Sequence, residues 1–137
     1  MASLITATVT QTGPSSSEIA IRRHRVPVDR PEANDGRDTG PMGGELLLGA
    51  LGGCFMSTLL AAIAARDVGV TDVQVHVQGH LAHSPGRFDE IALHVRARTT
   101  DAAALAKLTG MAERACIVAN TLRGTVTLRL SNEAVAP

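Results

Sequence analysis

Two cysteines, Cys54 and Cys116, are the residues of this chain whose type and position could do chemistry. Cys54 lies inside an uncharged, apolar run from Leu46 to Ala65, and Cys116 lies near the end of the only other segment with a good helical pattern. A thiol without charged neighbours takes its nucleophilicity from the groups that the fold brings to it. The pair therefore indicates a redox couple or a redox sensor, and the alternative is two small, buried apolar residues.

Length and composition restrict the class of protein. The chain has 137 residues, enough for one domain with an apolar core, and 13 basic residues balance 13 acidic ones. This balance gives no electrostatic reason to expect nucleic acid or a membrane as a partner. Phe55 and Phe88 are the only aromatic residues, which argues against a base-stacking surface.

The N-terminal sequence predicts a cytoplasmic protein. It has no basic segment followed by an apolar one, the pattern of a secretion signal. In the cytoplasm a cysteine pair is more often catalytic, redox-sensing or metal-binding than a structural disulfide.

The alternation of apolar residues predicts an α+β fold with mainly antiparallel sheets, because hairpins and adjacent strands dominate the pattern. A loop rich in glycine and proline separates the first strands from a long helix, and loops of its length are usually functional or disordered. The single domain, 1–137, then divides as follows: N-terminal strands at 1–29, the active-site loop at 30–44, a central helix at 45–67, a hairpin at 72–99, a second helical region at 100–122 and a C-terminal strand at 125–131.

The central helix is long enough to raise the question of a membrane span. Its glycines and alanines lower its hydropathy and strand patterns surround it, so we predict a central buried helix with Gly69 at its C-terminal cap. Gly49, Gly52 and Gly53 each weaken the helix by roughly 1 kcal/mol relative to alanine. This cost indicates a close approach by another helix or by a substrate.

The second helical region is predicted to begin at a cap on Thr99 or Thr100. Its apolar face has residues at helical spacing: Leu105, Leu108, Ala112 and Ala115. Cys116 follows this face, so its thiol is expected to point inward, toward the central helix that carries Cys54. The two thiols are therefore expected to meet.

The histidines give a weaker signal. His76 and His94 are predicted to lie nearly opposite each other on the outward face of the hairpin, and cross-strand histidine pairs can bind metal. No carboxylate or cysteine stands at useful spacing beside them, so we expect exposed polar positions and no metal site. The sequence also has no Ser-His-Asp triad pattern, P-loop or Rossmann glycine fingerprint.

The segment Gly40–Cys54 resembles the signature of the OsmC/Ohr family, in which a glycine- and proline-rich loop runs into a Glu-Leu-Leu helix that carries a cysteine. Val28–Pro31 and Asp38–Pro41 are typical of the OsmC-like branch. Ala115–Leu122 is similar to the second cysteine segment of the family, and the spacing of 62 residues between the thiols is similar too. The resemblance covers essentially the whole chain.

The resemblance implies an intertwined homodimer with active sites at its interface, which reduces organic hydroperoxides without a bound cofactor. It implies a peroxidatic thiolate at Cys54 and a resolving thiol at Cys116. An external dithiol, of the lipoyl or thioredoxin type, would reduce the disulfide that results. The apolar helix around Cys54 suits alkyl or lipid peroxides better than hydrogen peroxide.

The sequence departs from the family pattern at three places. The family has a glutamate ten residues before the first cysteine, where this chain has Gly44, and Glu45 stands nine residues before it. A shift of one residue turns a helical side chain by about 100°. Glu45 is therefore either a catalytic residue or a first-turn acid that the helix dipole favours. Ile117 replaces the usual proline after the second cysteine.

The third departure concerns the arginine that stabilises the thiolate in this family. The first hairpin, where one branch carries it, reads Gly-Pro-Ser at residues 13–15. Arg37 in the long loop is the predicted substitute, and the alternative is that it is a solvated loop residue. Three further candidates precede the loop: Arg22, Arg23 and Arg25.

A protein of another class remains as an alternative. A non-catalytic member of the fold could sequester an apolar ligand at the dimer interface. The two hypotheses differ in whether Cys54 is activated, because a thiol that titrates near the ordinary pKa of ~8.5 makes a poor peroxidase.

Overall fold

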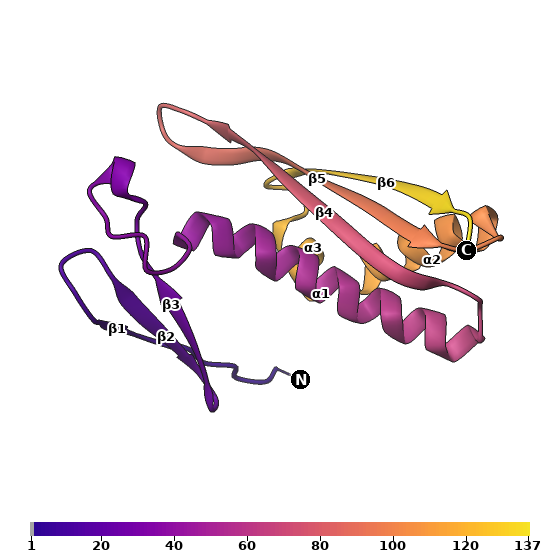
Figure 1. The fold of residues 1–137 in the computed structure, drawn as a ribbon, viewed down its shortest axis with the longest axis horizontal. Helices are drawn as coiled ribbons and strands as arrows, with labels where there is room; N and C mark the ends of the chain where they lie inside the picture. Colours follow the sequence, from indigo (N-terminus) through magenta and orange to yellow (C-terminus); the bar gives the residue numbers. More distant parts are fainter. Residues whose placement is uncertain (1) are drawn as a thin grey trace. The chain divides into compact units, whose positions relative to one another are not determined.

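The computed structural model describes residues 2–137, and its chain divides into two compact units, Met1–Leu47 and Leu48–Pro137. Each unit has its own three-stranded sheet (Figure 1). The long helix α1, Gly43–Arg66, begins in the first unit and continues through the second. The α+β class predicted from the sequence is confirmed, and three of the four strand pairings are antiparallel.

The first unit is a meander of three short strands followed by a loop. Strands β1 (Thr8–Gln11), β2 (Ser17–Ile21) and β3 (His24–Val28) pair in this order, all antiparallel. The turn between β2 and β3 holds Arg22 in a left-handed conformation (φ 52°), so this arginine lies in a turn and not in one of the N-terminal strands. Of the described residues 2–47, only Asp29 is buried.

The second unit packs helices on one face of its sheet. Strands β4 (Thr71–Ala82) and β5 (Arg87–Arg98) form the predicted hairpin, in which Val73, Val75 and Val77 turn toward the core. Helices α2 (Ala102–Ala115) and α3 (Ile117–Leu122) follow, and strand β6 (Thr127–Val135) completes the sheet in the order β4-β5-β6. Strand β6 runs parallel to β5, because the two helices carry the chain back to the end at which β5 begins.

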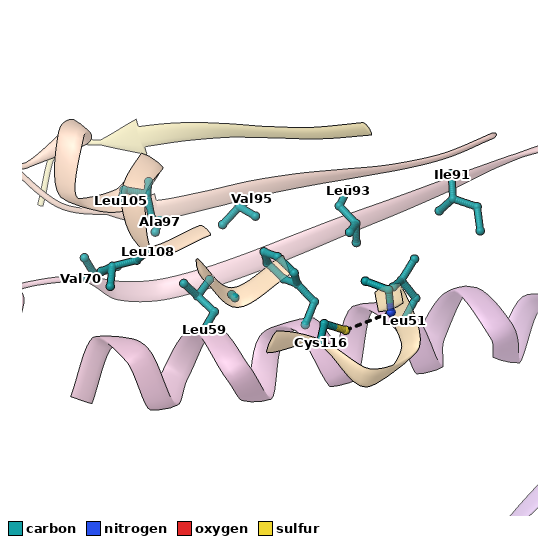
Figure 2. Packing of buried hydrophobic residues seen from close by; sticks show 13 residues of the cluster. Leu51, Leu59, Val70, Ile91, Leu93, Val95, Ala97, Leu105, Leu108 and Cys116 are labelled. Carbon is teal, nitrogen blue, oxygen red and sulfur yellow. Dashed lines mark hydrogen bonds between the residues drawn. The ribbon is translucent and has the colours of Figure 1, made fainter. Parts of the chain in front are cut away.

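The core of the second unit lies between the sheet and the helices. Figure 2 shows Ile91, Leu93 and Val95 of β5 directed toward α1. From α1, Leu51, Phe55 and Leu59 are fully buried. Helices α2 and α3 and their surroundings add the remaining members of the cluster: Val70, Ala97, Leu105, Leu108, Ala112, Cys116 and Ala119.

Two of the predicted helix caps are wrong. Helix α1 ends at Arg66, and Asp67 takes the left-handed conformation (φ 49°) that was expected of Gly69. Asp101, rather than Thr99 or Thr100, caps α2, since its side chain accepts a hydrogen bond from Ala104 N at 2.9 Å. Both positions favour aspartate, because its short polar side chain can form hydrogen bonds with the nearby backbone.

Three predicted boundaries also shift. The helix starts at Gly43 instead of residue 45, despite the low helix propensity of glycine. The loop before it contains one turn of 3-10 helix, η1 (Glu32–Asn34), where no regular structure was expected. Strand β6 occupies 127–135 instead of 125–131, because backbone pairing with β5 continues through its polar residues Asn132 and Glu133.

The three glycines of α1 differ in their surroundings. A Cβ on Gly52 would lie 2.8 Å from Val77 Cγ2, so this glycine allows β4 to approach the helix closely. Gly49 and Gly53 face open space instead. The prediction of a close approach is therefore right for Gly52, although the neighbour is a strand, and wrong for the other two within this chain.

Helix α1 is buried on one face only. Its buried residues are Leu51, Gly52, Phe55 and Leu59, and the opposite face exposes residues such as Gly53 and Leu60, the latter with 49% of its surface accessible. The expectation of a helix buried on every side is wrong for the single chain. By length and composition alone α1 could cross a membrane, a test that the core helix of a soluble protein also passes.

Candidate active site

The two cysteines lie on different elements of the second unit. Cys54 is half-buried in the middle of α1, and Cys116 is completely buried. Cys116 was predicted to lie within one helical region, 100–122. It is instead the single extended residue (φ −74°, ψ 117°) between α2 and α3. Its Sγ accepts a hydrogen bond from Ala119 N at 3.4 Å, drawn dashed in Figure 2, so the thiol caps α3. The cap fixes the direction of the Cys116 side chain.

The structure brings the two thiols together at the start of α3. Burial raises the pKa of Cys54, but the backbone N–H groups of Val118 and Ile117 and the Cys116 thiol donate to it, and the net effect lowers its pKa. Such donors stabilise the thiolate, because they interact more strongly with the charged form. No basic side chain contributes to the lowered pKa of Cys54 within this unit.

Cys116 has the opposite electrostatic character. Burial raises its pKa and the neighbouring Cys54 raises it further, while the Ala119 N–H offsets only part of this rise. When one proton leaves the pair, the negative charge therefore resides on Cys54. The two thiols therefore differ in acidity: the pKa of Cys54 is lowered and that of Cys116 is raised.

Hydrogen bonds and an ion pair connect the end of α2 to α3 and its C-terminal cap, on either side of Cys116. Arg123 pairs with the Glu113 carboxylate (2.8 Å) and donates to the Asn120 side chain (3.1 Å). Asn120 in turn donates to the Arg114 carbonyl oxygen at 3.0 Å. These residues were not predicted as part of the site, since their only signal in the sequence is the i, i+3 spacing of Asn120 and Arg123.

The other two predicted site residues, Glu45 and Arg37, belong to the first unit. The Glu45 carboxylate is exposed and accepts a hydrogen bond from Met42 N at 2.9 Å, which satisfies a free donor at the start of α1. Arg37 is exposed in the loop, and within residues 2–137 its side chain has no hydrogen-bond or ion-pair partner. A role for either residue in chemistry stays a prediction.

Asp29 anchors the loop that carries Arg37. Its carboxylate accepts hydrogen bonds from Ser15 Oγ (2.7 Å), Arg30 N (2.7 Å), Thr39 N (3.1 Å) and Thr39 Oγ1 (2.7 Å). Its own N–H donates to the Pro41 carbonyl oxygen at 3.1 Å. One residue therefore holds the loop at both ends. It lies within the Val28–Pro31 motif, but no role was predicted for it.

We expect Asp29→Asn to lower the melting temperature at pH 7 by roughly 5 °C, because the variant lacks the charged acceptor. The hydrogen bonds from Thr39 and Ser15 hold the pKa of Asp29 far below its usual value, against the effect of burial. A lowered folded-state pKa stabilises the protein above the unfolded pKa of about 3.9, and this contribution is lost as the pH falls below it. The difference between parent and variant should therefore shrink below about pH 4.

Thermal melts from pH 3 to pH 7 measure this difference. Asp38→Asn is the matched control, since Asp38 is an exposed carboxylate of the same loop and its side chain has no hydrogen bond within residues 2–137. Parallel pH profiles for the parent and Asp29→Asn would show that the anchor contributes no stability through its charge.

The histidine pair is placed as predicted, but it has an acidic neighbour. His76 and His94 are directly opposite in the β4–β5 register. The parallel strand β6 brings Ser131 Oγ within 2.7 Å and Glu133 Oε2 within 3.4 Å of the His94 ring nitrogens, a contact that sequence spacing did not indicate. Among residues 2–137 no group of three or more histidine, cysteine or acidic side chains is arranged to hold a metal ion.

Known proteins share this fold. A hypothetical protein from Aquifex aeolicus VF5 aligns with a TM-score of 0.86 at 15% identity, covering 99% of each chain. An OsmC-like protein from Mycoplasma pneumoniae aligns with 0.82 at 20% identity, again covering 99% of each. An organic hydroperoxide resistance protein from Elizabethkingia anophelis aligns with 0.79 at 19% identity, covering 98% of this chain and 100% of the other. At these identities the likeness shows the fold alone.

Sequence comparison gives the family. No curated protein is significantly similar to the chain. The sequence pattern of the OsmC-like proteins matches residues 36–131, which include both cysteines and all of α1. This match, together with the shared fold, confirms the resemblance seen in the two cysteine motifs: the chain belongs to the family of OsmC-like proteins.

Proposed function

We propose that this protein is a thiol-dependent peroxidase that reduces organic hydroperoxides to alcohols. The observation that supports the proposal is the asymmetric thiol pair. Backbone donors lower the pKa of Cys54, the pKa of Cys116 is raised, and the two thiols are neighbours. The similar fold of a protein named for organic hydroperoxide resistance agrees with this chemistry.

The proposed first step oxidises Cys54. Its thiolate attacks the distal oxygen of the hydroperoxide, an S–O bond forms, the O–O bond breaks, and the departing alkoxide takes up a proton and leaves as the alcohol. Cys54 is then a sulfenic acid. The activated thiolate is what this step needs, because the thiol form is a poor nucleophile.

In the proposed second step Cys116 attacks the sulfenic sulfur of Cys54. The S–S bond forms, the S–O bond breaks, and the hydroxyl leaves as water with the proton of Cys116. An external dithiol, lipoyl- or thioredoxin-type, then reduces the disulfide by exchange and is itself oxidised to a disulfide. The cycle needs no bound cofactor, and the reducing cytoplasm would supply the dithiol.

We further propose that the working form is a homodimer. Of the described residues 2–47 only Asp29 is buried, and Val9 is 61% exposed on its short strand. The exposed face of α1, with Leu60, is also apolar. A second copy of the chain would cover such surfaces, and each Å² of apolar surface buried contributes roughly 25 cal/mol.

Two side chains have proposed but separate roles. We propose Arg37 as the residue that stabilises the Cys54 thiolate in the assembled site. For Glu45, the hydrogen bond from Met42 N favours a role at the helix start over one in catalysis.

Stoichiometric oxidation tests the function. One equivalent of cumene hydroperoxide should remove both free thiols and give a single intrachain Cys54–Cys116 disulfide, detected by thiol counting and non-reducing peptide mapping. Cys116→Ser should stop at a sulfenic acid on Cys54 that dimedone traps, and Cys54→Ser should not react. Two free thiols left in the parent, with no sulfenic acid trapped, would contradict a peroxidase and favour a non-catalytic binding protein.

A further inference from the structure

One side chain joins α1, which carries Cys54, to the last turn of α2, which directly precedes Cys116. Thr58 of α1 is half-buried, and its Oγ1 lies 2.9 Å from the Phe55 carbonyl oxygen and 3.1 Å from that of Ala112 in α2. A hydroxyl has one proton, so this donor is shared between a carbonyl of its own helix and one of another helix.

The Ala112 carbonyl is open to this contact because α2 is ending. Its α-helical partner would be the N–H of Cys116, but that N–H donates to the Glu113 carbonyl oxygen instead, at 3.3 Å. Ala112 itself is buried, with 1% of its surface accessible. The Thr58 hydroxyl therefore donates to a backbone carbonyl group at a buried residue. Because a buried carbonyl needs a donor, this hydrogen bond holds α1 and α2 together.

The spacing relates this contact to the cysteines. Cys54 lies four residues before Thr58 on α1, and Cys116 lies four residues after Ala112. Four residues are about one helical turn. Cys54 thus lies about one turn before the shared contact on α1, and Cys116 directly follows the last turn of α2, which contains Ala112.

We propose that Thr58 is a positioning residue for the redox pair, which holds α1 against the end of α2 so that the Cys54 and Cys116 sulfur atoms can bond. The proposal rests on the thiol chemistry proposed above. A disulfide tolerates little error, with an S–S bond of about 2.05 Å and Cβ atoms about 3.8 Å apart. The attack of Cys54 on a hydroperoxide has no such dependence on the helix spacing.

The two chemical steps should therefore respond differently to a variant. Thr58→Val keeps the shape of the side chain and removes the hydroxyl. It should lower the equilibrium constant for the Cys54–Cys116 disulfide, and the rate at which the sulfenic acid is resolved, by about fivefold. The rate of sulfenic acid formation should stay within about twofold of the parent. The hydrogen bonds to Cys54, from the Val118 and Ile117 N–H groups and the Cys116 thiol, tolerate a wider range of distances than a disulfide does.

Two measurements separate these effects. Titration of the disulfide in glutathione redox buffers gives the equilibrium constant without any peroxide. Rapid mixing with cumene hydroperoxide, with and without dimedone, separates formation of the sulfenic acid from its resolution. If the parent forms the disulfide in the titration but does not react with the hydroperoxide, the peroxidase proposal fails, and the titration still decides the role of Thr58.

Thr109→Val is the matched control. Thr109 is a fully buried threonine of α2 whose hydroxyl donates only within its own helix, to the Ala106 carbonyl oxygen at 2.9 Å. Thr109→Val and Thr58→Ser should both keep the parent equilibrium constant. If Thr58→Val does not fold, the comparison of Thr58→Ala with Thr58→Ser takes its place in the same titration.

Two results would overturn the proposal. One is an equilibrium constant and a resolution rate for Thr58→Val within twofold of the parent. The other is an equal fall in both chemical steps, which would mean that the hydroxyl supports the fold in general and does not position the thiols.

Discussion

Ile117→Pro should slow the reaction of Cys54 with an organic hydroperoxide at pH 7 by about tenfold, because proline has no N–H to donate to the thiolate. Burial raises the pKa of Cys54, and the N–H groups of Val118 and Ile117 act with the Cys116 thiol to outweigh it. Without one of these donors the pKa should rise. Stopped-flow rates measured from pH 5 to pH 10 should show the profile of the variant moved to higher pH, with both proteins alike where each is fully ionised.

The fold should tolerate this substitution. Ile117 is the first residue of α3, a position at which proline is favoured, and its side chain is 71% exposed. The preceding Cys116 already has the extended conformation that a following proline requires. Ile117→Ala is the control, since it removes the side chain and keeps the N–H. Equal rates for the proline and alanine variants at pH 7 would mean that this donor does not activate Cys54.

The Ile117→Pro variant restores the residue that the family pattern has after the second cysteine. With proline after the second cysteine, a protein has no donor at this position. The isoleucine of this chain thus adds an N–H beside Cys54.

Arg37→Ala should reduce the rate of the same reaction at neutral pH by tenfold or more, if its guanidinium lies near Cys54 in the assembled protein. A fixed positive charge beside a thiol favours the thiolate and lowers its pKa. Arg37 is an exposed loop residue, so its loss should change the melting temperature little. Raising the pH should restore much of the rate by supplying thiolate directly.

Arg23→Ala is the control for Arg37→Ala. Arg23 is an exposed arginine in the turn between β2 and β3, and its replacement removes the same charge from the same unit. Reaction rates at pH 7 equal to the parent in both variants would show that Arg37 is a solvated loop residue. The lowered pKa of Cys54 would then depend on the backbone donors of α3 and the Cys116 thiol.

Much of the fold could be predicted from the sequence because its signals are local. The alternation of Val73, Val75 and Val77 with polar residues predicted β4 and its buried face, and the β4–β5 register bears this out. The parallel pairing of β6 with β5 could not be predicted in this way. The direction of β6 depends on how two helices carry the chain between these strands. The residue pattern of β6 does not indicate whether it pairs parallel or antiparallel to β5.

The two thiols of the site could be predicted from the sequence, but the groups around them could not. The apolar face that precedes Cys116 indicated that its thiol points toward α1, and the two thiols do meet. The groups that distinguish the thiols could not be predicted, since they are backbone N–H groups whose direction depends on the extended conformation of Cys116. The roles of Asp29 and Thr58 could not be predicted for a similar reason: Thr39 and Ala112, with which they form hydrogen bonds, are distant in sequence.

The burial of Asp29, alone among residues 2–47, has a consequence for how the protein responds to dilution. A three-stranded sheet with no buried apolar face cannot offset the conformational entropy of ordering its chain. In the proposed dimer, folding of this unit and association of two chains are then one equilibrium, whose position depends on protein concentration. Dilution would release the Arg37 loop first, while the core that holds Cys54 and Cys116 stays folded within each chain.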